Sequence, residues 1–177
     1  PGGISRLQAV SSYASELLGR MNGCAVSAVL AKGDGITAVP LTEDFQSVRS
    51  LIENLSPLLM TSEGTSLGNG IKAALSSFPE QSSAASFIWL FTDCEETDSS
   101  LQSSLSECLK AGIPVVIIGF GSERESEIFA GDGITKVKTA LRSGSVEKMI
   151  LSLKEKFVSA KRNSSAPSVA YIDASEV

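Results

Sequence analysis

Two short segments of this 177-residue sequence place oxygen-bearing side chains where a metal ion could be held. Residues 64–71 carry Thr65 in a glycine-rich stretch, and an apolar run over residues 87–91 stops abruptly at Thr92 and Asp93. An apolar run without alternation is typical of a strand that helices cover on both faces. Because open parallel sheets bind their ligands beyond the carboxyl ends of the strands, the two segments together predict a site for a hard cation.

Part of the first segment also fits a pattern of hydrolytic enzymes. Residues 64–68 read Gly-Thr-Ser-Leu-Gly, which matches the G-x-S-x-G turn of a nucleophilic serine. Such a serine needs a base, usually histidine, and the sequence has no histidine and no S-x-x-K near this loop. A metal-assisted phosphohydrolase built on Asp93 would need carboxylates at other strand ends, and the sequence offers no convincing set. We therefore predict that the protein is not an enzyme.

Hydrophobic periodicity predicts the helices and strands that would position these residues. A first helix is predicted to begin next to Ser5, because Ser5 and Gln8 have the spacing of a capping box. Strands over residues 25–31 and 36–41 flank a short turn and form an antiparallel hairpin, with the second strand at the edge of the sheet. Further helices are expected from residues 45 to 55, 67 to 78, 101 to 109 and 146 to 157, and further strands over residues 87–91, 113–118, 134–141 and 168–172.

This alternation predicts an α/β fold. We expect a doubly wound, mostly parallel sheet with helices on both faces and one antiparallel edge strand. A length of 177 residues suits a single domain over residues 1–177.

The composition excludes several classes of function. The net charge is -5, and the basic residues are scattered, so no nucleic-acid partner is expected. No stretch approaches the roughly 18 apolar residues that cross a bilayer, and no signal-peptide pattern is present at the start, so we expect a soluble domain. The sequence has an odd number of cysteines, and none of them has CxxC spacing; they are Cys24, Cys94 and Cys108. We expect them to be small buried residues, not a disulfide framework or a zinc site.

Several segments, in this order, resemble the von Willebrand factor type A family. Residues 5–10 are similar to its first helix, and residues 64–71 look like its second metal motif. Residues 88–97 look like its third motif, with Cys94 where glycine is commoner, and residues 110–121 look like the next helix–strand junction. Within the family, these motifs most resemble those of bacterial members, including the membrane-tethered Bat (aerotolerance) group.

The resemblance implies a metal-ion-dependent adhesion site that binds a protein partner. Thr65 would supply a hydroxyl ligand and Asp93 a carboxylate ligand to Mg²⁺, or to Mn²⁺ or Ca²⁺ in its place. Few carboxylates leave such an ion electron-poor, so it can accept a carboxylate from the partner. The alternative is a metal-independent scaffold with a degenerate adhesion site. The location is left open between the periplasm and tethering to a membrane through segments outside these residues.

Each candidate ligand also has a simpler structural explanation. Thr65 could cap the helix that begins near Leu67, and Asp93 could cap the turn that follows it. The acidic residues within segment 95–98 are typical of a solvated loop. Only the joint presence of Thr65 and Asp93, in the order that the family shows, favours the metal site.

The first metal motif of the family, D-x-S-x-S after the first strand, has no counterpart before the first helix of this sequence. Either the first strand lies upstream of Pro1, or the domain is circularly permuted and residues 168–177 supply that strand. In the permuted arrangement Asp173 and Ser175 would join the two ligands already named. Val177 would then stand where the motif has its last serine, and valine cannot coordinate a metal.

Overall fold

A computed structural model of the protein describes residues 5–59, 64–80, 84–93, 100–120, 134–137 and 169–173. In chain order its elements are α1 Arg6–Arg20, β1 Val26–Leu30, β2 Ile36–Thr42, α2 Phe45–Glu53, the 3-10 turn η1 Pro57–Leu59, α3 Leu67–Ser76, β3 Ile88–Thr92, α4 Leu101–Ala111, β4 Val115–Gly119, β5 Ile134–Val137 and β6 Val169–Asp173.

Local sequence sets where the helices start. The predicted capping box of α1 is confirmed: Ser5 Oγ accepts a hydrogen bond from Gln8 N at 3.2 Å, and Gln8 Oε1 accepts one from Ser5 N at 2.9 Å. Helix α2 starts after Asp44, whose Oδ1 accepts from Gln46 N at 3.0 Å. These bonds satisfy amide groups that the first turn of a helix leaves without an intrahelical partner.

The strands form two sheets. Four of them pair in the order β3-β4-β6-β5, and every pair in this sheet is parallel. The remaining two, β1 and β2, form a separate antiparallel hairpin. The predicted doubly wound α/β class is confirmed, and the hairpin is antiparallel as predicted, but among the described residues it does not pair with the parallel sheet. The predicted strand over residues 134–141 is described only for its first four residues, and the predicted helix over residues 146–157 lies outside the described residues.

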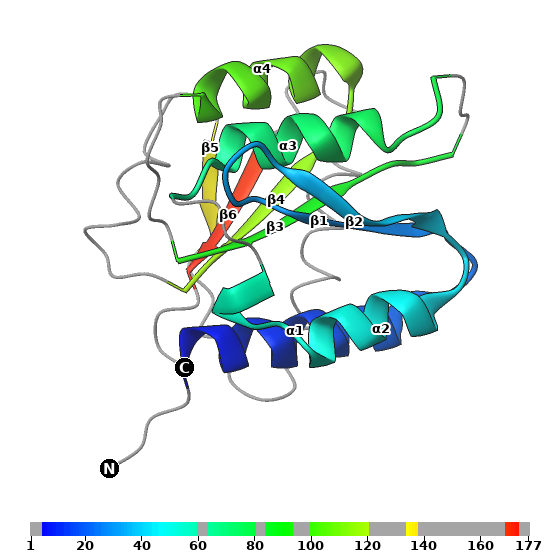
Figure 1. Ribbon diagram of the computed structural model, residues 1–177. Helices are drawn as coiled ribbons and strands as arrows, with labels where there is room; N and C mark the ends of the chain where they lie inside the picture. The colour runs from blue at the N-terminus through cyan, green and yellow to red at the C-terminus, as the bar shows by residue number, and fades with distance from the viewer. Residues whose placement is uncertain are drawn as a thin grey trace.

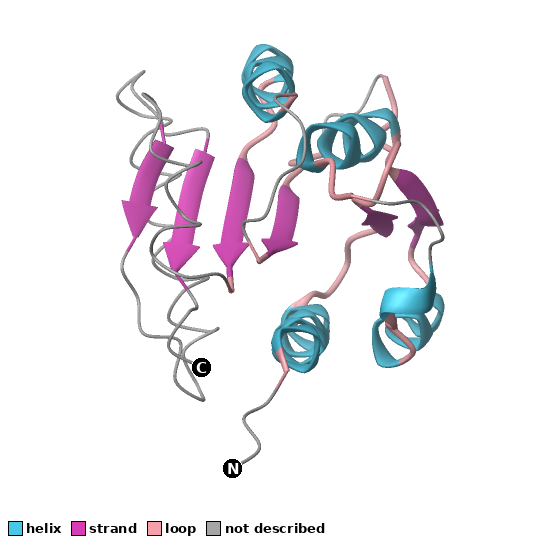
Figure 2. Cartoon of the chain, turned by 60° about the vertical axis from the view of Figure 1, so that its left-hand side comes forward, coloured by secondary structure: helices cyan, strands magenta, loops and turns pink. Residues whose placement is uncertain are grey.

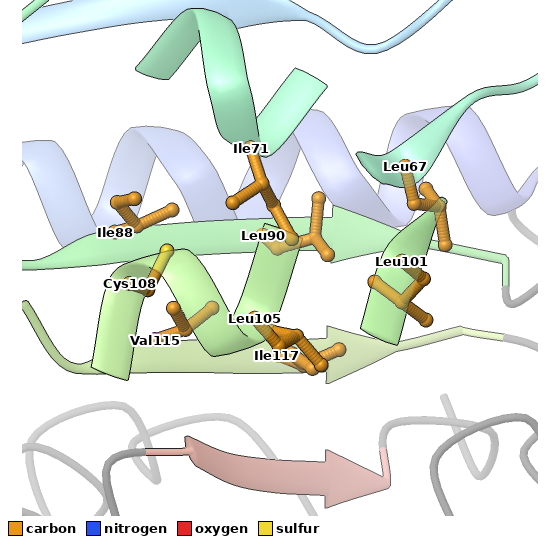
Figure 3. Close-up of a cluster of buried hydrophobic side chains, with 9 residues drawn as sticks. All are labelled: Leu67, Ile71, Ile88, Leu90, Leu101, Leu105, Cys108, Val115 and Ile117. Atoms are coloured by element: carbon orange, nitrogen blue, oxygen red, sulfur yellow. The ribbon is translucent and has the colours of Figure 1, made fainter. Parts of the chain in front are cut away.

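Helices cover strands β3 and β4 of the parallel sheet on both faces (Figures 1 and 2). On one face α3 and α4 pack on Ile88 and Leu90 of β3 and on alternate residues of β4 (Figure 3). On the other face α1 packs on the residues that alternate with these along the strands, including Val116 and Ile118 of β4. The alternation follows from the geometry of a strand, in which successive side chains point to opposite faces. A third cluster joins α1 and α2 to the hairpin through Leu18, Val48 and Ile52.

The cysteines are only partly as predicted. Cys108 of α4 is buried in the core, whereas Cys24, in the connection before β1, is exposed. Cys94 lies outside the described residues. A connection on the molecular surface can expose a small apolar residue at little cost, which accounts for Cys24.

Burial of Cys108 predicts a loss of stability in alkaline solution. Burial, followed by the nearby Glu107 charge, raises the pKa of this thiol from 9.0 to about 11. The unfolded chain releases the proton at lower pH than the folded chain does. The contribution to stability is therefore complete below about pH 9 and is lost as the pH rises towards 11. A difference of about two pKa units corresponds to about 2–3 kcal/mol.

Urea unfolding measured between about pH 8 and pH 11 tests this prediction. In the Cys108→Ala variant this part of the decline should disappear, although the variant starts from a lower stability. Equal declines in the two proteins would show that the thiol does not cause them.

Candidate metal site

Thr65 lies in a loop that is fastened to the turn of the β1–β2 hairpin. Thr65 and Lys32 form an isolated antiparallel bridge, and Gly33 N donates a hydrogen bond to Gly64 O at 3.3 Å. The Lys32 side chain reaches further and donates to Pro57 O of η1 at 3.3 Å. Gly64 adopts a φ of 81°, which glycine tolerates without steric cost. The backbone therefore fixes the position of Thr65 just before α3.

Ser66, and not Thr65, caps helix α3. The Ser66 hydroxyl accepts a hydrogen bond from Asn69 N at 3.3 Å, and Ser66 is buried. The simpler explanation of Thr65 as the helix cap is therefore wrong. Sequence reasoning missed Ser66, although a serine three residues before Asn69 has the spacing of an N-cap and its N3 residue.

The glycines that follow allow α3 to approach its neighbours closely. A Cβ at Gly68 would lie 2.0 Å from Ser100 Oγ at the start of α4. A Cβ at Gly70 would lie 2.4 Å from Ala31 Cβ, directly after β1. The glycine-rich sequence is thus explained by packing on two sides, and this packing holds the start of α3 in place.

Asp93 directly follows β3 and is partly buried. The end of this strand is held to the next one, because Phe120 N donates to Thr92 O at 2.8 Å. Figure 3 shows Leu67, in the first turn of α3, at the arrowhead end of β3, together with Leu101 of α4. The start of α3 and the carboxyl end of β3 therefore meet at one edge of the sheet. The structure thus brings the segments of Thr65 and Asp93 to the same edge.

Asp173 ends β6 at this edge but is separated from β3 by β4. It pairs in register with Gly119, which pairs in turn with Thr92. At about 4.8 Å between neighbouring strands, Asp173 lies roughly 10 Å from the end of β3 along the sheet. In the permuted arrangement this strand would instead lie between β1 and β3. Ser175 and the acidic segment 95–98 lie outside the described residues.

The residues at this edge suit a hard divalent cation. A threonine hydroxyl and an aspartate carboxylate are oxygen donors, which Mg²⁺, Mn²⁺ and Ca²⁺ prefer. Within the described residues no three His, Cys, Asp or Glu side chains group together as a metal cage. An ion held here would thus have few negative ligands from these residues. Such an ion retains water molecules or takes up further oxygen ligands from elsewhere.

The chain belongs to the von Willebrand factor type A family, whose domain model matches residues 3–149. Domains of this family generally mediate interactions between proteins and are generally not enzymes. The doubly wound α/β arrangement of helices and strands agrees with this membership.

The solved structures that are similar to this chain include two from Bacteroides species. One is an aerotolerance-related membrane protein from Bacteroides fragilis NCTC 9343 with multiple mutations to serines, at 30% identity and a TM-score of 0.61. The other is the conserved hypothetical protein BatB from Bacteroides thetaiotaomicron, at 29% identity and a TM-score of 0.62. Each alignment covers 65% of this chain, and 57% and 56% of the two relatives, so this chain spans little more than half of their length. No curated protein matches the chain.

The resemblance to bacterial Bat-like proteins is thereby supported. Within the described residues, none of the helices is both long enough and apolar enough to cross a membrane.

Proposed function

We propose that this domain binds a protein partner through a divalent cation at the carboxyl edge of its sheet. Thr65 and Asp93 provide a hydroxyl and a carboxylate ligand, and the partner provides a further carboxylate. The observation that carries the proposal is the division of roles at the start of α3. Ser66 caps the helix, so the helix does not require Thr65 as its cap. The loop nevertheless holds Thr65 at the edge where Asp93 follows β3.

The electrostatics of the edge support a partner with a carboxylate. A cation with few protein carboxylates retains most of its positive charge, and its remaining coordination positions are filled by water. A carboxylate from another protein can replace such a water and gains a strong, charge-assisted contact. Recognition through a shared ion needs no bond to be broken, in agreement with a binding role.

The first test is the Asp93→Asn variant of the full-length protein. We expect the wild type to unfold at a higher temperature in saturating Mg²⁺ than in EDTA. An ion present at about a hundred times its dissociation constant adds about 2.7 kcal/mol. For a domain of this size the rise is roughly 5–10 °C. Asn keeps the shape of Asp93 but removes its charge, so the variant should lose most of the rise.

Glu80→Gln is the matched control, because Glu80 is an exposed carboxylate beyond the other end of α3. This control should keep the whole rise. A rise that is equally large in Asp93→Asn and Glu80→Gln would contradict the assignment of Asp93. No rise in the wild type would favour the metal-independent scaffold.

A further inference from the structure

The connection between β1 and β2, residues 31–35, lies against the segment that carries Thr65, and we call this connection the hairpin turn. Two backbone contacts join it to the Thr65 loop. Lys32 forms a bridge with Thr65, and Gly33 N donates a hydrogen bond to Gly64 O at 3.3 Å. Because the main chain makes both contacts, the hairpin turn cannot shift without moving the backbone of Thr65 or breaking these contacts.

The hairpin turn also packs directly on the first turn of α3 (Figure 1). A Cβ at Gly35 would lie 2.5 Å from the Asn69 carbonyl oxygen and 2.9 Å from Gly70 N. A Cβ at Gly70 would clash with the Ala31 side chain. The Asn69 side-chain amide adds a long hydrogen bond, donated to Gly33 O at 3.5 Å. The turn and the helix therefore approach each other so closely that a larger residue at position 35 would force them apart.

Position 35 favours glycine for a second reason, which a comparison with position 23 separates from the first. Gly35 has a φ of 75° and Gly23 a φ of 65°, both in the left-handed region. Alanine is strained at either position, because its Cβ crowds the backbone there. A Cβ at Gly23, however, would meet no atom of the described residues within 4 Å. Alanine therefore brings backbone strain at both positions, but it pushes the hairpin turn away from α3 only at position 35.

We propose that the hairpin turn is a positioning element of the cation site and that Gly35 is the residue that allows it to take this place. The inference rests on the proposed function, because it concerns the affinity of the site at Thr65. Mg²⁺ requires a nearly ideal octahedron of oxygen ligands. A ligand that moves by more than about 0.5 Å no longer fits such a site. The hairpin turn acts through the backbone of Thr65 and does not itself touch the ion.

Thermodynamic linkage adds a consequence in the opposite direction. If the contacts between the hairpin turn and the Thr65 loop favour cation binding, cation binding must strengthen these contacts by the same factor. The Gly33 amide reports on the contacts, because it donates to Gly64 O. Its exchange with solvent should therefore slow when the site is filled.

Two variants with the same kind of backbone strain test the proposal. Mn²⁺ is titrated into the full-length wild type, Gly35→Ala and Gly23→Ala, and binding is followed by electron paramagnetic resonance. We expect Gly35→Ala to raise the dissociation constant at least about tenfold and Gly23→Ala to change it by less than about twofold. An equal rise in both variants would show that strain alone weakens binding and would overturn the inference. Wild-type affinity in Gly35→Ala would overturn it as well.

Hydrogen exchange of the wild type decides the matter if Gly35→Ala does not fold. When saturating Mg²⁺ replaces EDTA, the Gly33 amide should exchange at least about fivefold more slowly. The internal control is the Gly112 amide, which donates to Leu109 O at the end of α4 and should change by less than about twofold. Equal slowing of both amides, or no slowing of Gly33, would contradict a specific link between the turn and the site.

The outcomes also separate this inference from the proposed function. A wild type that binds no Mn²⁺ would overturn both. A wild type that binds Mn²⁺, together with a Gly33 amide that does not respond to Mg²⁺ and a Gly35→Ala variant of unchanged affinity, would overturn only the role of the hairpin turn.

Discussion

Replacing Ile117 with alanine is expected to lower the free energy of unfolding by about 2–5 kcal/mol. Ile117 is 0% exposed and lies in β4, between Leu90 of β3 and Tyr171 of β6. Its side chain packs under α3 and α4 (Figure 3). Because strands hold β4 on both sides and helices cover it, the surroundings cannot collapse into the space that the variant leaves. The unfolding temperature should fall by roughly 4–20 °C.

Ile36→Ala is the matched control, since Ile36 is 51% exposed on the antiparallel strand β2. This variant removes the same atoms from a site where water already reaches them, so we expect a cost of about 1 kcal/mol or less. Denaturant unfolding of both variants measures the difference. Similar costs would contradict the central position of β4 in the sheet.

Gly68→Ala is expected to destabilise the protein by about 1–3 kcal/mol. The new Cβ would lie 2.0 Å from Ser100 Oγ and 2.5 Å from the Ser100 carbonyl carbon, so α3 and α4 would have to separate. Because the start of α3 carries the Thr65 loop, the same substitution should also reduce the rise of the unfolding temperature in Mg²⁺. A glycine that served only as a flexible residue would show neither effect.

Gly19→Ala in α1 is the control, and we expect it to stabilise the protein instead of destabilising it. A Cβ at Gly19 would meet no atom within 4 Å. Alanine favours the helix more than glycine does, so this variant should gain about 0.5–1 kcal/mol. If Gly68→Ala also stabilised the protein, the close contact between α3 and α4 would be contradicted.

Much of the fold could be predicted from periodicity, because burial on both faces leaves a strong signal. The apolar run that ends at Thr92 predicted β3 to within one residue, and the capping box at Ser5 predicted the start of α1. The order of the strands could not be predicted in this way. Nothing in residues 169–173 indicates that this segment pairs between β4 and β5, since strand pairing depends on contacts distant in sequence.

The candidate site could be predicted in part. A hydroxyl and a carboxylate at the ends of elements were recognisable by residue type, and the structure brings both segments to one edge. The roles of the neighbouring residues were not recognisable. Whether Thr65 or Ser66 caps α3 depends on where the helix begins, and helix ends are the least predictable positions in a sequence. The contact of Gly68 with Ser100 joins residues from two helices, and no local pattern predicts it.

The most direct test of the proposed cation site is a titration of Mn²⁺ into the full-length protein, followed by electron paramagnetic resonance. Mn²⁺ is a paramagnetic substitute that accepts the same oxygen ligands as Mg²⁺. We compare the wild type with Thr65→Ala and with Thr37→Ala, in which the exposed threonine of β2 is changed instead. The account predicts saturable binding in the wild type and in Thr37→Ala, and a dissociation constant at least about tenfold higher in Thr65→Ala. Saturable binding that is equally strong in all three proteins, or no saturable binding in any of them, would contradict a cation site at Thr65.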